Sequence, residues 1–384
     1  MQETCKTGAN LIIVKHFQSG DMSDVYFADF HASKPSDSVP RKINKLFKAA
    51  ELGETFSKGD LVAVKTHFGE EGNSAFLRAE LVSVVVDNIS KKGGNPFLTD
   101  CNTLYRGMRT NAVDHLNIAA RHGFTYPIVN APVIIADGLL GTDDTEVEVN
   151  LKHCKTIRYG SAVAHANSMV VVSHFKGHGL TGFGGAIKNV GMGLGSRHGK
   201  LQMHHSVRPY VNQAACRGCK SCEEVCLSSA IRVSSGRASI NPDLCLGCGE
   251  CFLTCPYGAI SAGAETGYED LQERIVEYCC GILKSKKDKV GYVTFIMDFT
   301  PLCDCYGFSG APVMPNVGIL VSRDIVSIDQ AAADLVNSSK YFIMQKKKAE
   351  DNISSLSDAN WQRQLEYAES LGLGERDYQL VKIK

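Results

Sequence analysis

Eight cysteines lie between positions 216 and 255 and repeat one spacing twice. The first quartet is Cys216, Cys219, Cys222 and Cys226, and the second is Cys245, Cys248, Cys251 and Cys255, which Pro256 follows. Intervals of three residues let one short loop turn three thiolates toward a common centre, and the C-x₂-C-x₂-C-x₃-C run is specific for iron–sulfur clusters. The backbone between these ligands has to wrap round an inorganic group, which restricts its local fold strongly.

In such a duplicated run, the fourth thiolate of each cluster comes from the other half of the motif. The spacing therefore predicts two [4Fe–4S] clusters with crossed ligation. One is held by Cys216, Cys219, Cys222 and Cys255, and the other by Cys245, Cys248, Cys251 and Cys226. A pair of zinc sites is the alternative, because C-x₂-C is also a zinc spacing, but the full C-x₂-C-x₂-C-x₃-C run is much more specific for clusters.

Composition narrows the class of protein further. The chain has 15 cysteines, which is many for a reducing compartment where disulfides are rare, and this favours metal ligation. Lys plus Arg and Asp plus Glu both number 41, so the zero net charge gives no reason to expect nucleic-acid or membrane binding. We expect no transmembrane helix and no signal peptide, because long apolar runs are missing, and hence a cytoplasmic protein.

Strand-like and helix-like segments alternate on both sides of the cysteine-rich stretch. Strands are expected at residues 61–67, 96–100, 133–136, 169–173, 290–297, 317–321 and 378–383, and helices at 75–92, 111–122, 268–283, 328–337 and 361–371. The alternation predicts an α/β fold with a mainly parallel sheet covered by helices on both faces. Residues 146–149 suggest a half-exposed strand or hairpin, and residues 33–40 a loop. We expect one discontinuous α/β domain, residues 1–209 and 264–384, interrupted by a small ferredoxin-like α+β module at 210–263.

Residues 173–200 form a glycine-dense turn after a predicted strand, which is where α/β sheets bind ligands. Glycines let a ligand approach the backbone, and a helix opening at Ala186 favours an anion at its N-terminus. The turn fits neither a Walker A loop nor a dinucleotide-binding fingerprint. It supplies the candidate catalytic residues His174, His178, Lys188 and His204 and the candidate cofactor-binding residues Gly182, Gly184, Gly185 and Lys188. The alternative is a structural loop whose histidines are merely solvated.

Other candidates follow other strands. Lys65 and His67 end the first strand, and Arg106 after the second suits a carboxylate or phosphate. Cys303 and Cys305 flank Asp304, which is enough for part of a metal site or a redox pair. The alternative is two buried thiols in a loop without a chemical role.

Because the carboxyl ends of parallel strands share one edge, these loops are predicted to meet in one cleft, faced by at least one cluster. His178 or His204 then serves as an acid or base near neutral pH, since an unperturbed histidine titrates near about 6.5.

Five segments carry a resemblance to a known family. They are KTHFGE at 65–70, TDCNTLYRG at 99–107, HFKGH at 174–178, GGAIKNVGMG at 184–193 and PLCDC at 301–305. The chain resembles domain of unknown function 362, whose members often carry an inserted two-cluster ferredoxin. The cysteine-rich stretch is similar to the bacterial two-cluster ferredoxin throughout, except that Leu227 stands where that family usually has proline.

A second resemblance concerns three residues. The lactate racemase family has a histidine, a lysine ten positions later and a histidine sixteen positions after that, as do His178, Lys188 and His204 here. In that family the lysine holds a nickel-pincer nucleotide and the last histidine binds the metal. The resemblance implies a further metal or organic cofactor near Lys188.

Taken together, these patterns predict an iron–sulfur oxidoreductase that passes electrons to or from a small molecule in the α/β domain. Its partners are then a redox protein or that small-molecule substrate, with no nucleic acid and no membrane. Two alternatives remain, an electron carrier or scaffold without its own substrate, and a non-redox enzyme with a covalent or metal cofactor at the glycine-rich loop.

Overall fold

The computed structural model describes residues 22–105, 107–204, 209–226, 228–245, 251, 254–262, 265–341 and 350–383. Arg106, Leu227 and Cys248 lie outside the described residues.

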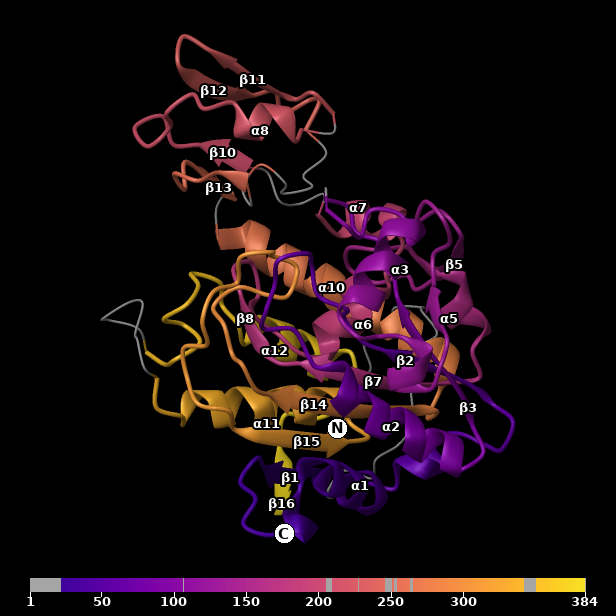
Figure 1. Ribbon diagram of the computed structural model, residues 1–384. Helices are drawn as coiled ribbons and strands as arrows, with labels where there is room; N and C mark the ends of the chain where they lie inside the picture. Colours follow the sequence, from indigo (N-terminus) through magenta and orange to yellow (C-terminus); the bar gives the residue numbers. More distant parts are fainter. Residues whose placement is uncertain are drawn as a thin grey trace, which may run out of the picture.

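An eight-stranded sheet runs through the large body of the molecule, in the order β16-β1-β15-β14-β7-β2-β3-β4 (Figure 1). Its strands are β1 (Ser23–Asp29), β2 (Leu61–Lys65), β3 (Asn95–Asp100), β4 (Val133–Ile135), β7 (Ser168–His174), β14 (Val290–Ile296), β15 (Gly318–Ser322) and β16 (Tyr378–Lys382). Among these strands, β15 alone runs against its two neighbours, β1 and β14, and the other pairings are parallel. The prediction of a mainly parallel sheet is therefore confirmed.

Successive side chains of the central strands enter two separate cores. Met169 and Val171 of β7 belong to one apolar cluster, whereas Val170 and Val172 belong to the other. Alternate residues of a strand point to opposite faces, so a strand that is apolar at every position needs cover on both sides. This explains why the run MVVVS predicts a central buried strand.

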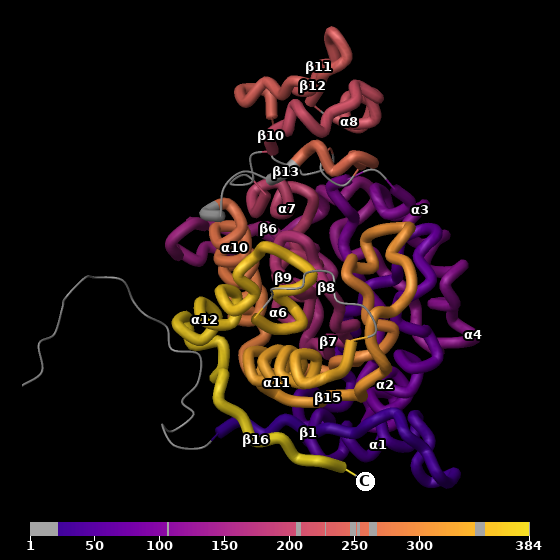
Figure 2. The backbone as a smooth tube through the Cα atoms, turned by 90° about the vertical axis from the view of Figure 1, so that its left-hand side faces the viewer, coloured from indigo at the N-terminus to yellow at the C-terminus, as the bar shows by residue number. Residues whose placement is uncertain are grey.

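Helices supply that cover on both faces, as predicted (Figures 1 and 2). On one face lie α1 (Val39–Ala49) and α2 (Ala79–Lys91), whose apolar residues join the cluster of Val170. On the other face lie α6 (Ala186–Leu194), α10 (Glu265–Lys286), α11 (Ile325–Asn337) and α12 (Arg363–Ser370). Shorter helices, α3 (Ala112–Arg121), α4 (Tyr126–Val129), α5 (Ser161–His165) and α7 (Arg197–His204), occupy the connections.

The N-terminal elements differ most from the sequence prediction. Strand β1 and helix α1 were not predicted, and the expected loop at 33–40 contains a 3-10 turn, Pro35–Asp37, and the start of α1. Pro40 lies in the first turn of α1, where the missing N–H of proline costs nothing. The expected hairpin near residue 146 is present as β5 (Asp144–Glu148) paired antiparallel with β6 (Thr156–Gly160).

The cysteine-rich segment lies outside the large sheet. Strand β10 (Pro209–Val211) pairs with β13 (Ile260–Ala262), and β11 (Ile231–Ser234) pairs with β12 (Arg237–Ile240), next to helix α8 (Ser221–Glu224). These elements form a small body beyond α7 and the start of α10, as the ribbon and the backbone tube both show (Figures 1 and 2). Its own apolar cluster includes Cys216, Cys222 and Cys251. Across the described parts of the chain, no helix is long and apolar enough to cross a membrane.

Candidate functional site

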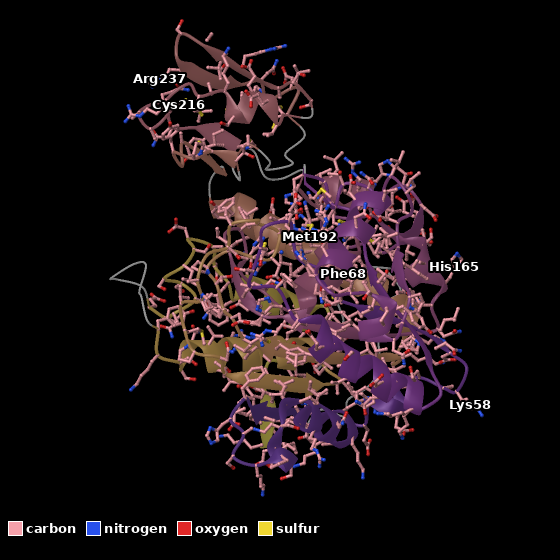
Figure 3. The ribbon with its side chains drawn as sticks, viewed as in Figure 1. Lys58, Phe68, His165, Met192, Cys216 and Arg237 are labelled. Carbon is pink, nitrogen blue, oxygen red and sulfur yellow. The ribbon has the colours of Figure 1, made fainter. Side chains whose placement is uncertain are left out.

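A cavity of about 120 Å³ lies where segments following several parallel strands come together. The polar side chains that line it lie at the ends of strands β2, β3, β7 and β14 or on the segments that follow them. They are Lys65, His67, Asp100, Tyr105, Arg109, Lys176, His178, Lys188, Lys200, His204, Cys303 and Cys305. Leu271 and Ile275 of α10 and Met192 of α6 form an apolar wall. Met192 is labelled in Figure 3, in the part of the large body nearest the cysteine-rich segment. The prediction that the strand-end loops meet in one cleft is confirmed.

Lys65 is held at the floor of this cavity by partners on two other elements. Its Nζ lies 3.0 Å from Oδ1 of Asp100 on β3 and donates to Oδ1 of Asn189 on α6 over 2.6 Å. Burial lowers the pKa of Lys65, although the carboxylate of Asp100 opposes this shift. Burial alone would raise the pKa of Asp100, but nearby cations, Lys65 first, outweigh it and leave that pKa well below its usual range.

His67 connects the charged side of the cavity with a thiol. Its Nε2 lies 2.9 Å from Nη1 of Arg109 and 3.4 Å from Sγ of Cys305. Arg109 is 1% exposed, pairs with Glu70 over 3.1 Å and also hydrogen-bonds the hydroxyl of Tyr105. Burial, followed by the charge of Arg109, lowers the pKa of His67. Burial and the neighbouring guanidinium thus both disfavour a positive charge on this ring.

Asp304, between the two cysteines, is fully buried and paired with cations. Its carboxylate lies 2.7 Å from Nζ of Lys176 and 3.0 Å from Nδ1 of His174. Burial alone would raise the pKa of Asp304, but the charges of His174 and Lys176 reverse this and lower it strongly. Nε2 of His174 lies 2.6 Å from the carbonyl oxygen of Met297, so both ring nitrogens are engaged by acceptors. The side chain of His174 anchors the Cys303 loop and is not among the residues lining the cavity.

The glycine-rich segment contributes a lysine and two histidines to the lining. His178 lies on β8 (Lys176–His178), which pairs with β9 (Gly182–Gly184), Lys188 lies on α6 and His204 ends α7. Burial, followed by the charge of Lys188, lowers the pKa of His178 and lowers that of His204 to about 4. Both rings are neutral at pH 7 and accept protons poorly, in contrast to the predicted titration near neutral pH.

The start of α6 is already occupied by an anion from the same chain. Asp329 of α11 accepts hydrogen bonds from the backbone N–H groups of Ala186 (2.7 Å) and Ile187 (2.9 Å). A Cβ added to Gly185 would lie 2.3 Å from Asp329, so this glycine allows the carboxylate to approach. The expectation that this helix terminus receives a ligand anion is wrong, because an internal carboxylate satisfies it.

The cavity contains most of the predicted residues and some that the sequence did not indicate. Lys65, His67, His178, Gly184, Gly185, Lys188, His204, Cys303 and Cys305 line it, whereas Gly182 packs against Trp361 and Arg106 lies outside the described residues. Arg109 and Lys200 were missed. Arg109 lies two residues after the segment TDCNTLYRG, and Lys200 ends the glycine-dense segment 173–200, so their closeness to these segments is the signal that could have found them.

A second cavity lies in the cysteine-rich segment, where Cys216 is labelled in Figure 3. Its lining includes Cys216, Cys219, Cys222 and Cys255, the four thiols that crossed ligation assigns to one cluster. Backbone N–H groups point at two of these sulfurs, Ala238 at Cys216 over 3.4 Å and Ala259 at Cys255 over 3.3 Å. Nevertheless, no three of these four described sulfurs lie within 4.8 Å of one another.

One group of potential ligand atoms that close together occurs among the described residues, at His153, Asp270 and Glu273. The carboxylate of Glu273 already pairs with Lys152, Arg363 and His153, so an internal ion-pair network accounts for it. Cys303 and Cys305 belong to no such group of three among the described residues, although Nε2 of His67 lies 3.4 Å from Sγ of Cys305.

Two solved structures share limited similarity with this chain. The lactate racemase apoprotein from Thermoanaerobacterium thermosaccharolyticum has a TM-score of 0.39 and 13% identity, over 66% of this chain and 48% of that chain. A protein from Thermotoga maritima has a TM-score of 0.36 and 9% identity, over 89% of this chain and 60% of that chain. The chain thus spans about half to three fifths of the length of these structures.

No curated protein matches the sequence. Residues 62–334, by contrast, match the model of a family described as Domain of unknown function (DUF362). That match takes in β2 through α11, including the cavity-lining segments and the cysteine-rich segment. The chain belongs to the DUF362 family.

Proposed function

We propose that this chain is an iron–sulfur oxidoreductase that moves electrons between two [4Fe–4S] clusters and a small molecule in the α/β body. The observation that carries this is the common cavity of Cys216, Cys219, Cys222 and Cys255. Cys255 comes from the second quartet, so its presence beside the first three supports crossed ligation. Residues 210–263 then act as an inserted ferredoxin-like module within a discontinuous α/β domain.

The spacing of these thiols supports a cluster over zinc. Four thiolates around one zinc ion, at Zn–S distances of about 2.3 Å, would lie about 3.8 Å apart. The described thiols surround one cavity without any three approaching within 4.8 Å, which suits a larger group. Cys226, Cys245 and Cys251 are assigned to the second cluster by spacing, together with Cys248.

When bound, the clusters supply or accept single electrons. The chain's own residues would then hold the substrate in the cavity. Lys188 makes no hydrogen bond or ion pair within the described residues and is free to bind an anionic group. Leu271, Ile275 and Met192 supply apolar lining to the same cavity. A redox protein would exchange electrons with the clusters, and the reduced thiols required fit a cytoplasmic location.

Iron analysis and EPR of anaerobically purified protein test this proposal. About eight irons per chain and two interacting reduced clusters are expected. In Cys255→Ser, the cluster assigned to Cys216, Cys219 and Cys222 should be lost or altered, whereas Cys280→Ser on α10 should retain both. Zinc without iron contradicts the proposal, and damage confined to the other cluster in Cys255→Ser contradicts the crossed assignment.

The cavity favours an enzyme over a carrier or scaffold. Gly184, Gly185 and Lys188 line a space at the glycine-rich loop, which a docking body would not need. Purified protein that exchanges electrons with no metabolite of a cell extract would favour the carrier instead.

A second candidate is a non-redox enzyme with a cofactor on Lys188. It is favoured by one observation, that His178, Lys188 and His204 line the same cavity from three separate elements. The residues fit a covalently held group because Lys188 is unpaired among the described residues and half-buried. Intact-mass spectrometry of native protein decides its covalent form, since an unmodified Lys188 removes it.

A further inference from the structure

Two cysteines at the cavity differ sharply in their surroundings. Cys305 is half-buried and Cys303, two positions before it, is 1% exposed, and both line the cavity. The loop that carries them is fixed from both sides, because Asp304 between them pairs with His174 and Lys176. The backbone carbonyl of Asp304 in addition accepts a hydrogen bond from the N–H of Glu70 over 2.9 Å.

The groups around Cys305 favour its negatively charged form. His67 Nε2 lies 3.4 Å from its sulfur, and the guanidinium of Arg109 lies directly behind His67. The hydrogen bond with Cys303, together with His67 and Lys188, holds the pKa of Cys305 well below its usual range. The same hydrogen bond, burial and the charge on Cys305 raise the pKa of Cys303. An accessible thiolate next to a buried thiol is the arrangement that thiol–disulfide exchange requires.

The charges on the cavity wall indicate what kind of molecule reaches Cys305. Lys65, Arg109 and Lys176 are neutralised by Asp100, Glu70 and Asp304 respectively. Lys188 and Lys200 line the same cavity without an ion pair among the described residues; Lys200 donates hydrogen bonds to the carbonyls of Gly193 and Gly195 and its charge also acts on the buried Asp137. The wall therefore carries a surplus of positive charge that suits an anionic ligand.

We propose that Cys305 and Cys303 are a thiol–disulfide exchange pair that acts on a small anionic disulfide, with Cys305 attacking and Cys303 resolving. The thiolate of Cys305 attacks one sulfur of the disulfide, the S–S bond breaks, and the leaving thiolate takes a proton from water. Cys303 then loses its proton and attacks the sulfur of Cys305. This releases the second thiolate and leaves a Cys303–Cys305 disulfide, so two electrons pass from the protein dithiol to the substrate.

Repeated turnover rests on the proposed function, because the clusters would return the two electrons one at a time to the Cys303–Cys305 disulfide. A single round of exchange does not need the clusters. The exchange pair and the iron–sulfur proposal can therefore fail separately. The iron content is measured on the same sample to tell the two failures apart.

The test uses the full chain, purified anaerobically, and 3,3′-dithiodipropionate as the probe. Cystamine, a disulfide of similar length with positive charges, is the matched control probe. Tryptic residues 290–323 contain Cys303 and Cys305 and no other cysteine, so peptide mass mapping isolates the pair. We expect an internal disulfide in this peptide, release of 3-mercaptopropionate, and reaction faster by about tenfold or more than with cystamine.

Variants identify the two roles. Cys303→Ser should accumulate a mixed disulfide on Cys305, and Cys305→Ser should give neither product in this peptide. Cys280→Ser, on the half-buried face of α10, should react like the wild type. Thermal unfolding followed by circular dichroism checks that each variant is folded. If a variant does not fold, the peptide mapping of the wild-type protein still tests the proposal.

The proposal is overturned if the wild-type peptide stays unmodified while iron is present, or if cystamine reacts as fast as dithiodipropionate. It is also overturned if Cys303→Ser traps no adduct on Cys305. Exchange in protein that binds no iron would leave the dithiol assignment standing and reject the cluster proposal instead.

Discussion

At the scale of single residues, the cavity is built from charges that compensate one another. Lys65 and Asp100 are both almost completely buried, and each removes the main cost of burying the other. A buried ion pair need not add net stability, but removing one partner leaves an uncompensated charge in a medium of low dielectric constant.

Lys65→Met should therefore lower the free energy of unfolding by about 3–5 kcal/mol, because Asp100 loses its nearest cation. Urea denaturation followed by circular dichroism measures this loss. Adding Asp100→Leu to Lys65→Met should recover part of it, since the stranded charge is then removed. Simple additivity of the two single-variant losses would show that the pair is not energetically coupled.

At the scale of secondary structure, helix α6 depends on a residue of α11. Asp329 supplies the acceptors for two N–H groups that have no partner within α6. Because the carboxylate is fully buried, its pKa is raised to about 7 despite those hydrogen bonds. The glycine-rich loop, and with it Lys188, is thus positioned by a contact between two distant helices.

This pKa predicts how stability depends on pH. In the unfolded chain Asp329 ionises near about pH 3.9, whereas in the folded protein it ionises near pH 7. As the pH rises, the unfolded chain loses its proton first. Asp329 therefore makes its full contribution to the free energy of unfolding below about pH 4. As the pH rises to about 7 this contribution is lost, which lowers the free energy of unfolding by at most about 4 kcal/mol.

Asp329→Asn should remove this part of the pH dependence of stability. Urea titrations of the variant and the wild type between pH 4 and pH 8 compare the two slopes. Asp334→Asn, an exposed carboxylate on the same helix, should keep the wild-type slope. Parallel curves for Asp329→Asn and the wild type would show that Asp329 is ionised throughout this range.

At the scale of the whole molecule, the cysteine-rich segment leaves the large body and returns to it at neighbouring points. Pro209 and Ala262 face each other in the antiparallel pair of β10 and β13, so their Cα atoms lie within about 5.5 Å. Its described strands pair only among themselves, and the eight strands of the large sheet all lie outside it.

Replacing residues 210–261 with a short glycine–serine linker should therefore leave a folded large body that contains no iron. Circular dichroism would retain helix and strand signals and a cooperative thermal transition, while elemental analysis finds the iron gone. A truncated protein that aggregates or unfolds would show that the large body needs the segment for its own stability.

The sequence alone determined the features that depend on local pattern. Alternating periodicity predicted the α/β sheet, and cysteine spacing predicted that Cys255 lies with the first three thiols of the other quartet. The common direction of parallel strands brought Lys65, Lys188 and Cys303 to one cavity. Such inferences hold because backbone geometry sets how often a side chain returns to the same face of a helix or strand, and because parallel strands all end at one edge of their sheet.

The contacts that each side chain makes in and around this cavity depend on packing in three dimensions. The ring of His174 hydrogen-bonds Asp304, and Asp329 binds the N-terminus of α6, where a ligand was expected. Arg109 lines the cavity although no motif predicted it. These contacts join residues far apart in sequence, and burial and charge at each site depend on all the elements packed around it. The lowered pKa values of His178 and His204 have the same origin, because burial beside Lys188 disfavours a second positive charge.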